Sequence, residues 1–230
     1  MKKRSLLLAP FAFLLVAGQG CADSDNSIYI KQVISPPVPG EDGCLYTADA
    51  DQPNLPQGVM DIGLTGSYAP NVLIANQITN GKNVEELRND TGTVIIKGAV
   101  VSVSEPNGAL IREFTTVTAG NTSSTSSTEP GYGAPAITMI DAATSAILAP
   151  AVTVGNSRLV VAKVRAFGTT VGGTDVESQE FTFPITVCRG CLVSGTGANC
   201  DDATDKKPPC RFGQDQDVDR CLCKGYAVCQ

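Results

Sequence analysis

Apolar and polar residues alternate in several short stretches of the chain. In residues 181–187, Phe, Ile and Val alternate with Thr and Pro184, and in residues 159–166 an apolar face stands opposite Lys163 and Arg165. A period of two residues is that of a β-strand with one buried face. Both stretches are therefore predicted as strands. Pro184 falls on the outward face, which favours an edge position or a bulge.

Residues 93–104 alternate over a longer stretch, with Gly98 as the candidate position of a β-bulge. The turn residues at 105–108 (Glu-Pro-Asn-Gly) predict a hairpin that leads into a strand at 110–116. Weaker apolar stretches predict further strands at residues 28–34, 59–64, 72–78 and 137–140.

Two short helices are predicted between these strands. One starts at Asn83, where Asn83 and Glu86 have the spacing of an N-cap and its partner. The other follows Asp141, covers residues 142–148 and ends before Pro150.

About seven or eight short strands, with turn signals between them and no long helical period, indicate an all-β fold. We expect an antiparallel β-sandwich of the immunoglobulin or fibronectin type III kind over residues 28–187, with its extra length in long loops. Residues 33–58, rich in Pro and Gly, are expected to cross the surface without regular structure. Residues 120–134, rich in Ser, Thr, Gly and Pro, are expected to form a mobile surface loop.

The N-terminus has the pattern of a secretory signal. Residues 2–4 are all basic, residues 6–16 form an apolar run, and small residues then lead into Cys21. The apolar run is too short for a membrane-spanning helix, which needs about 20 apolar residues. This pattern predicts a signal peptide over residues 1–20 that is removed on export.

Gly20 and Cys21 match the end of the lipobox of bacterial lipoproteins, in which the Cys is lipidated. The motif usually has Leu three residues and Ala or Ser two residues before the Cys, where this chain has Gly and Gln. Ordinary cleavage after Gly20 or Ala22, without a lipid, is the alternative. Residues 21–27 are interpreted as lipid anchor and tether. The residue after Cys21 is not Asp, which by the sorting rule of well-studied lipoproteins implies the outer membrane.

The chain has nine cysteines, and an odd number in an exported protein requires an explanation. Lipidation of Cys21 leaves eight, enough for four disulfides. Seven of these lie in residues 188–230, a polar tail with too few apolar residues for a core of its own, which we expect disulfides to hold together. The eight are Cys44, Cys188, Cys191, Cys200, Cys210, Cys221, Cys223 and Cys229.

Because seven is odd, complete pairing requires one tail cysteine to bond to Cys44. We therefore expect a disulfide that joins the tail to the sandwich domain. Cys221 and Cys223 are too close to bridge readily and are expected to take different partners. A bridge between Cys188 and Cys191 is one arrangement and cross-pairing is another, and the sequence leaves the pairing open.

Two kinds of chemistry compete with a purely structural role of the tail cysteines. Cys188, Cys191, Cys221 and Cys223 have the type and number of ligands of a zinc site. Cys188 and Cys191 also have the spacing of a redox pair, but the glycines that follow argue against the helix that such a pair normally opens. Outside the reducing cytosol, disulfides are favoured over both.

A weak calcium candidate lies later in the tail. Asp215, Asp217 and Asp219 resemble the start of a calcium-binding loop. Arg220 and Tyr226 stand where that motif requires Gly and Glu, so a solvated turn is favoured.

Composition excludes several functions. Removal of residues 1–20 takes away three of the 17 basic residues and none of the 23 acidic ones, which leaves a net charge of −9 and no electrostatic surface for nucleic acid. The chain has no His, which excludes Ser-His and Cys-His catalysis and a His-ligated zinc, and no cofactor is expected. The remaining enzyme alternative is a hydrolase with two carboxylates, for instance Asp61 or Glu180.

Residues 158–200 carry a recognisable pattern. It consists of Gly168-x-Thr170-x2-Gly173, Ser178, Phe181-x-Phe183-Pro184-Ile185-x-Val187 and Cys188-x-Gly190-Cys191-Leu192-Val193. Together with the lipid Cys, an early isolated Cys and Asn76-Gln77 after an apolar strand, this pattern is similar to uncharacterised outer-membrane lipoproteins of myxobacteria over most of the mature chain. The resemblance implies localisation and architecture and brings no known activity.

The sequence therefore predicts a non-catalytic, lipid-anchored lipoprotein of the cell envelope, with a structural or binding role at the outer membrane. Its partner is the membrane, through the lipid, and a protein or glycan that the sequence does not identify. One alternative is a carbohydrate-binding or adhesive module, although the absence of Trp weakens the usual sugar-stacking surface. The other is the acidic hydrolase.

Overall fold

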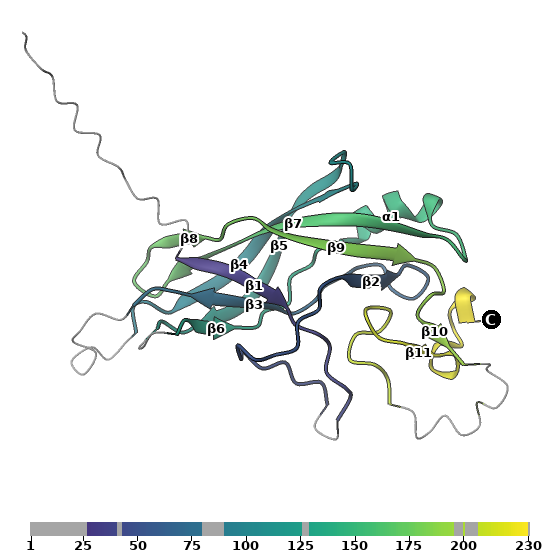
Figure 1. Ribbon diagram of the computed structural model, residues 1–230, viewed down its shortest axis with the longest axis horizontal. Coiled ribbons are helices and arrows are strands. Elements are labelled where there is room, and N and C mark those ends of the chain that lie inside the picture. The colour runs from purple at the N-terminus through teal and green to yellow at the C-terminus, as the bar shows by residue number, and fades with distance from the viewer. Residues whose placement is uncertain are drawn as a thin grey trace, which may run out of the picture.

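The protein is seen here in a computed structural model, which describes residues 27–40, 43–79, 90–125, 129–195, 200 and 207–229. The expected signal peptide, the lipidation site Cys21 and the expected helix at Asn83 lie outside these residues. The described chain is mostly β-strand, arranged in two main sheets and one small one, which confirms the all-β prediction (Figure 1).

The larger sheet contains six strands. In spatial order they are β2 (Gly58–Asp61), β9 (Phe181–Cys188), β7 (Ser157–Thr170), β4 (Val94–Ser104) and β5 (Leu110–Thr122), with β8 (Asp175–Glu177) paired to β7. β9, β7, β4 and β5 pair antiparallel, and β4 and β5 form the predicted hairpin.

The prediction of a purely antiparallel sandwich is wrong at β2. This strand runs parallel to β9, with Gly58 opposite Ile185 and Asp61 opposite Cys188. β2 precedes β9 in the chain and is not joined to it by a hairpin. A tight hairpin would force the two strands to run antiparallel, whereas the long chain between them allows the parallel direction.

The second sheet has three antiparallel strands, β1 (Ile28–Val33), β3 (Val72–Asn76) and β6 (Gly131–Gly133), in the order β1-β3-β6. Side chains from both sheets share one buried apolar cluster, to which β3 contributes Ile74 and β9 contributes Phe183. Alternate residues of β7, predicted to face inward, are fully buried: Val160, Ala162, Val164 and Ala166. The two sheets thus enclose the core between them.

Several local predictions are confirmed. The register shifts at Gly98 in both pairings of β4, as expected for a bulge. Helix α1 (Ala142–Leu148) follows Asp141, whose carboxylate accepts a hydrogen bond from the Thr144 N–H at 2.7 Å. A short 3₁₀ helix, η1 (Ala149–Ala151), follows it.

Pro184 does not lie in an edge strand, because β9 is flanked by both β2 and β7. The pairing with β2 starts only at Ile185, one residue later. Pro184 therefore lies in the part of β9 that β2 does not reach. The N–H that Pro lacks is not needed there for a hydrogen bond to β2.

Two further predictions are wrong. Residues 137–140 form no strand: Ile137, Met139 and Ile140 are fully buried in irregular chain that bonds to the backbone of Tyr68 and Pro70. Residues 120–134 are not one surface loop, because β5 extends to Thr122 and β6 lies within the stretch. Both errors arise where tertiary contacts, not local pattern, decide the backbone.

The tail lies at one end of the molecule, beside β2 (Figure 1). It contains the parallel pair β10 (Val193–Ser194) and β11 (Val218–Asp219) and the 3₁₀ helices η3 (Arg220–Cys223) and η4 (Ala227–Cys229). A small apolar cluster joins tail residues such as Val218 to Leu64, which follows β2.

The tail also covers the edge of β2 that faces away from β9. The Asp61 N–H donates to the Gly213 carbonyl at 2.9 Å, and the Asp215 N–H donates to the Val59 carbonyl at 2.9 Å. Met60 and Gln214 form an isolated β-bridge between these bonds. An uncovered strand edge is a template for association with another chain, and here residues 213–215 fill it.

No described helix has the length and apolar character needed to cross a bilayer.

Candidate functional site

All eight cysteines of the expected set are paired. The disulfides are Cys44–Cys210, Cys188–Cys191, Cys200–Cys221 and Cys223–Cys229. The first confirms that Cys44 pairs with the tail, and the last two confirm that Cys221 and Cys223 take different partners. Of the arrangements left open, the Cys188–Cys191 bridge is the one formed. The zinc alternative is wrong, because its four sulfur ligands are all in disulfides.

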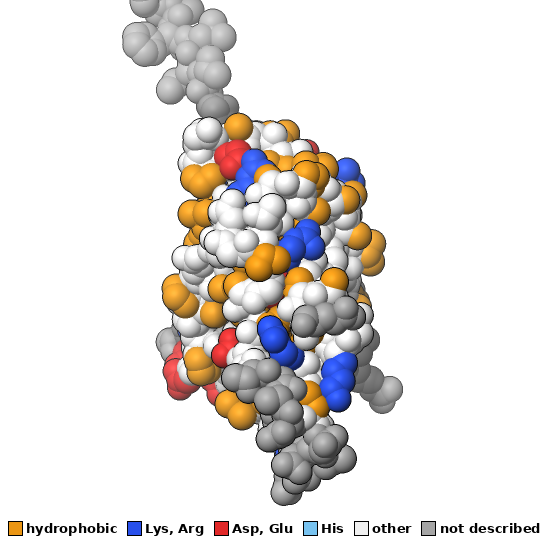
Figure 2. Space-filling view, turned by 90° about the vertical axis from the view of Figure 1, so that its right-hand side faces the viewer, with side chains coloured by type: hydrophobic (Ala, Val, Ile, Leu, Met, Phe, Trp, Pro, Cys, Tyr) orange, Lys and Arg blue, Asp and Glu red, His pale blue; other side chains and the backbone are white. Residues whose placement is uncertain are grey.

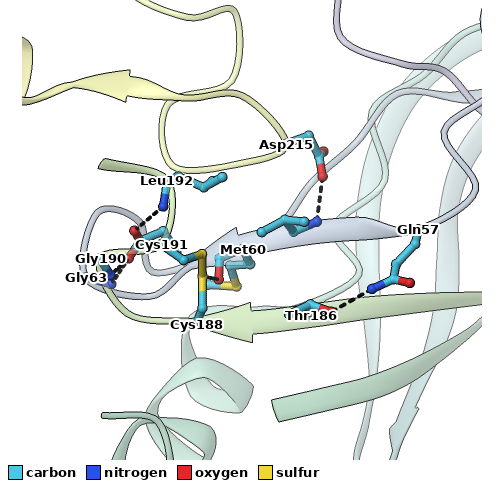
Figure 3. The surroundings of a disulfide bond; sticks show 11 residues. Gln57, Met60, Gly63, Thr186, Cys188, Gly190, Cys191, Leu192 and Asp215 are labelled. Carbon is cyan, nitrogen blue, oxygen red and sulfur yellow. Dashed lines mark hydrogen bonds between the residues drawn. A yellow bond between two sulfur atoms is a disulfide. The ribbon is translucent and has the colours of Figure 1, made fainter. Parts of the chain in front are cut away.

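Asp61, the last residue of β2, is fully buried. It accepts hydrogen bonds from residues around the Cys188–Cys191 bridge, which Figure 3 shows. Its Oδ1 accepts hydrogen bonds from the N–H groups of Gly63 and Gly190, each at 2.9 Å. Its Oδ2 accepts one from the Leu192 N–H at 3.1 Å. A buried carboxylate requires such donors, and here they come from the turn after β2 and from the loop that the disulfide closes.

Among the described residues, only one group of three metal-ligating residue types lies close together, and it is at this bridge. Atoms of Asp61, Cys188 and Cys191 lie within 4.8 Å of one another. The two sulfur atoms are bonded to each other, and the carboxylate already accepts three N–H groups. The trio therefore does not fit a metal ion.

The two carboxylates of the hydrolase alternative are not brought together. Glu180 precedes β9 and Asp61 pairs with its last residue, so the length of β9 separates them, roughly 25 Å at about 3.3 Å per residue. Glu180 is half-exposed and makes an ion pair with Lys163 at 2.8 Å. Paired carboxylates in glycosidases stand about 5–9.5 Å apart, so this pair cannot act on one bond.

Asp215 docks the tail onto β2. Its Oδ1 accepts from the Val59 N–H at 2.7 Å, and its Oδ2 accepts from the Tyr68 hydroxyl at 2.8 Å. Burial raises the pKa of Asp215 to about 6, although these hydrogen bonds and the Arg211 charge oppose the shift. Burial, followed by the charge of Asp215, raises the pKa of Tyr68 above its usual value.

The three carboxylates of the calcium candidate lie in different surroundings. Asp215 points to β2, Asp217 is exposed, and Asp219 caps η3 by accepting a hydrogen bond from the Cys221 N–H at 2.9 Å. They do not appear among the close groups of ligand atoms in the described residues. The favoured interpretation, a turn with structural carboxylates, fits this geometry better than a calcium loop.

An open groove of about 360 Å³ lies where residues near Cys44 meet β5 and β6. Tyr46 and Tyr132 line it, together with Asn121 and Ser123. Each ring is also approached by a cation: the Lys31 ammonium lies 5.3 Å from the Tyr132 ring centre, and the Arg211 guanidinium lies 5.3 Å from that of Tyr46. This groove could not be predicted from the sequence, because its residues come from three separate segments.

A second open pocket, of about 410 Å³, lies in front of the Cys188–Cys191 bridge. It is formed by residues 154–157, before and at the start of β7, and by residues 188–191. This end of the molecule faces the viewer in Figure 2, where Lys and Arg side chains are spread among apolar and uncharged ones.

Comparison with the models of protein families, with curated proteins and with solved structures finds no match to this chain.

Replacement of Asp61 by Ala removes the acceptor of three backbone N–H groups. Each buried donor left unsatisfied costs about 1–3 kcal/mol, so we expect the free energy of unfolding to fall by on the order of 3 kcal/mol in urea, with the disulfides intact. Asp61→Asn, which retains one acceptor oxygen, should lose less. The control is Glu180→Ala at a half-exposed ion pair, with an expected loss below about 1 kcal/mol. Equal losses for Asp61→Ala and Glu180→Ala would contradict the structural role of Asp61.

The raised pKa of Asp215, about 6 against 3.8 in an ordinary carboxyl, predicts a pH dependence of stability. The folded protein holds this proton more tightly than the unfolded chain, so its contribution is complete below pH 3.8 and is lost as the pH rises to about 6. We expect the free energy of unfolding to fall by on the order of 2 kcal/mol across this interval.

Asp215→Asn mimics the protonated carboxyl and should abolish this slope. Asp90 and Asp141 do not interfere: burial raises their pKa values, but hydrogen bonds outweigh it and hold both below 3.8. Urea unfolding at a series of pH values measures the effect. A slope that persists unchanged in Asp215→Asn would refute the assignment.

Proposed function

We propose that this protein is an exported, non-catalytic lipoprotein of the cell envelope, anchored through Cys21 to the outer membrane. The observation that carries the proposal is the set of four disulfides. The most important is Cys44–Cys210, which joins the tail to the segment before β2. Disulfides of this kind form and persist in oxidising compartments. They account for every cysteine except Cys21, which leaves that residue for the lipid.

The fold we propose for residues 28–187 is a sandwich of the immunoglobulin or fibronectin type III kind. Two sheets with a shared core support it. The resemblance to myxobacterial lipoproteins supports the envelope location in the same way, through Cys188-x-Gly190-Cys191 and the strand before it.

A binding role towards a neutral saccharide is the second candidate, and the groove at Tyr46 and Tyr132 favours it. Aromatic rings present flat apolar faces with a polar hydroxyl at the edge, which suits the C–H face and hydroxyl groups of a sugar. Asn121 and Ser123 add amide and hydroxyl groups to the same lining. Among the described residues, the groove lining carries no charged side chain, which disfavours a charged ligand.

The anchor is tested by intact-mass analysis of the protein purified from the membrane of the organism that makes it. We expect a chain that starts at Cys21 and carries a lipid-sized increment, because the lipobox ends there. Reduction should add about eight protons, one for each of the paired cysteines. An unlipidated chain that starts at Cys21 or Asp23 would contradict the anchor and leave the disulfide framework intact.

The binding role is tested on a glycan array with the disulfide-bonded chain from residue 22. If a saccharide binds, Tyr132→Ala should weaken it about tenfold or more, because it removes one wall of the groove. Tyr226→Ala is the matched control, since Tyr226 is 41% exposed and lies in the tail outside the groove. Binding by no glycan, or equal losses in the two variants, would overturn this second candidate without touching the anchor.

A further inference from the structure

The Cys188–Cys191 bridge joins a buried cysteine to an exposed one. Cys188 is 2% exposed and ends β9, whereas Cys191 is an exposed residue. Both line the pocket of about 410 Å³ described above. The other bridge between cysteines close in sequence, Cys223–Cys229, is buried at both ends, with 1% and 6% exposure.

The loop around this bridge is held in place by bonds that do not involve sulfur. In the sheet, Cys188 lies opposite Asp61 of β2 on one side and opposite Ser157 of β7 on the other. Its carbonyl accepts a hydrogen bond from the Ile62 N–H at 2.8 Å. The N–H groups of Gly190 and Leu192, on both sides of Cys191, donate to Asp61. The backbone of this loop is therefore held by hydrogen bonds that do not depend on the sulfur–sulfur bond.

The structural contribution of this bridge is also the smallest of the four. A disulfide stabilises mainly by restricting the unfolded chain, and the restriction grows with the length of the closed loop. Cys188 and Cys191 are separated by 3 residues, whereas Cys44 and Cys210 are separated by 166. Cys44 is exposed as well, but it lies in irregular chain that the bridge itself holds to the tail.

From accessibility, a retained loop and a small structural contribution, we infer that Cys188–Cys191 is a thiol–disulfide exchange site that accepts two electrons from an external dithiol entering the pocket at residues 154–157. Arg189 lines the same pocket, with its Nε donating to the Val152 carbonyl at 2.9 Å.

The exchange takes two balanced steps. A thiolate of the dithiol attacks the Sγ of Cys191, the bond between the two cysteines breaks, and Cys188 leaves as a thiolate that takes up a proton. The second thiol of the dithiol then loses its proton and attacks its own sulfur in the mixed disulfide. Cys191 is released as a thiolate and is protonated, the dithiol becomes a disulfide, and the protein has gained two electrons and two protons.

The test equilibrates the oxidised mature protein with graded ratios of reduced to oxidised dithiothreitol, traps thiols with N-ethylmaleimide and maps them by peptide mass. We expect Cys188 and Cys191 to be labelled at a ratio about tenfold or more lower than that for Cys223 and Cys229, with an unchanged circular dichroism spectrum. Simultaneous reduction of the two pairs, or reduction of Cys223–Cys229 first, would overturn the inference. So would loss of the folded spectrum as Cys188 and Cys191 appear.

A second measurement identifies the attacked sulfur. In the protein reduced at this bridge alone, iodoacetamide should label Cys191 about tenfold faster than Cys188, because Cys188 is buried. Comparable rates, or faster labelling of Cys188, would contradict attack at Cys191. The wild-type chain serves for both measurements, so neither depends on whether a cysteine variant folds. The double variant Cys188→Ser/Cys191→Ser is the control for dithiol consumed by other bridges.

Discussion

The junction of sheet and tail depends on β2, a strand of four residues that is paired along both edges. On one edge it pairs with β9, and on the other the tail supplies Gly213 and Asp215 as hydrogen-bond partners. A short strand with one neighbour would be weakly held, because each of its few backbone bonds is open to water. With β9 and the tail on either side, its backbone bonds are protected and the tail acquires a fixed position.

Carboxylates secure this position at both ends of β2. Asp61 at its end collects three N–H groups, and Asp215 bonds to the backbone of Val59 near its start. A buried carboxylate is costly without such donors, so each one selects the chain conformation that supplies them. Cys44–Cys210 then joins the irregular segment before β2 to the same tail. The polar tail is thus held by charge-assisted hydrogen bonds and disulfides together, with only a small apolar cluster of its own.

The sequence predicted the parts of the fold that repeat a local pattern. β7 and β9 alternate strictly, the bulge falls at Gly98, and α1 begins after Asp141. What it could not predict depends on segments distant in the chain. β6 is three residues long and exists through pairing with β3, and the direction of β2 follows from contacts with β9 and the tail. Cysteine parity correctly linked Cys44 to the tail, but only the three-dimensional arrangement selects Cys210.

The candidate site shows the same limit. Asp61 was recognisable as a carboxylate near a strand, and its sequence neighbours gave no sign that Gly190 and Leu192 would donate to it. β1 begins at the end of the molecule opposite the tail (Figure 1). The Cys188–Cys191 pocket lies at the tail end, so the length of the two sheets separates it from the first described residues.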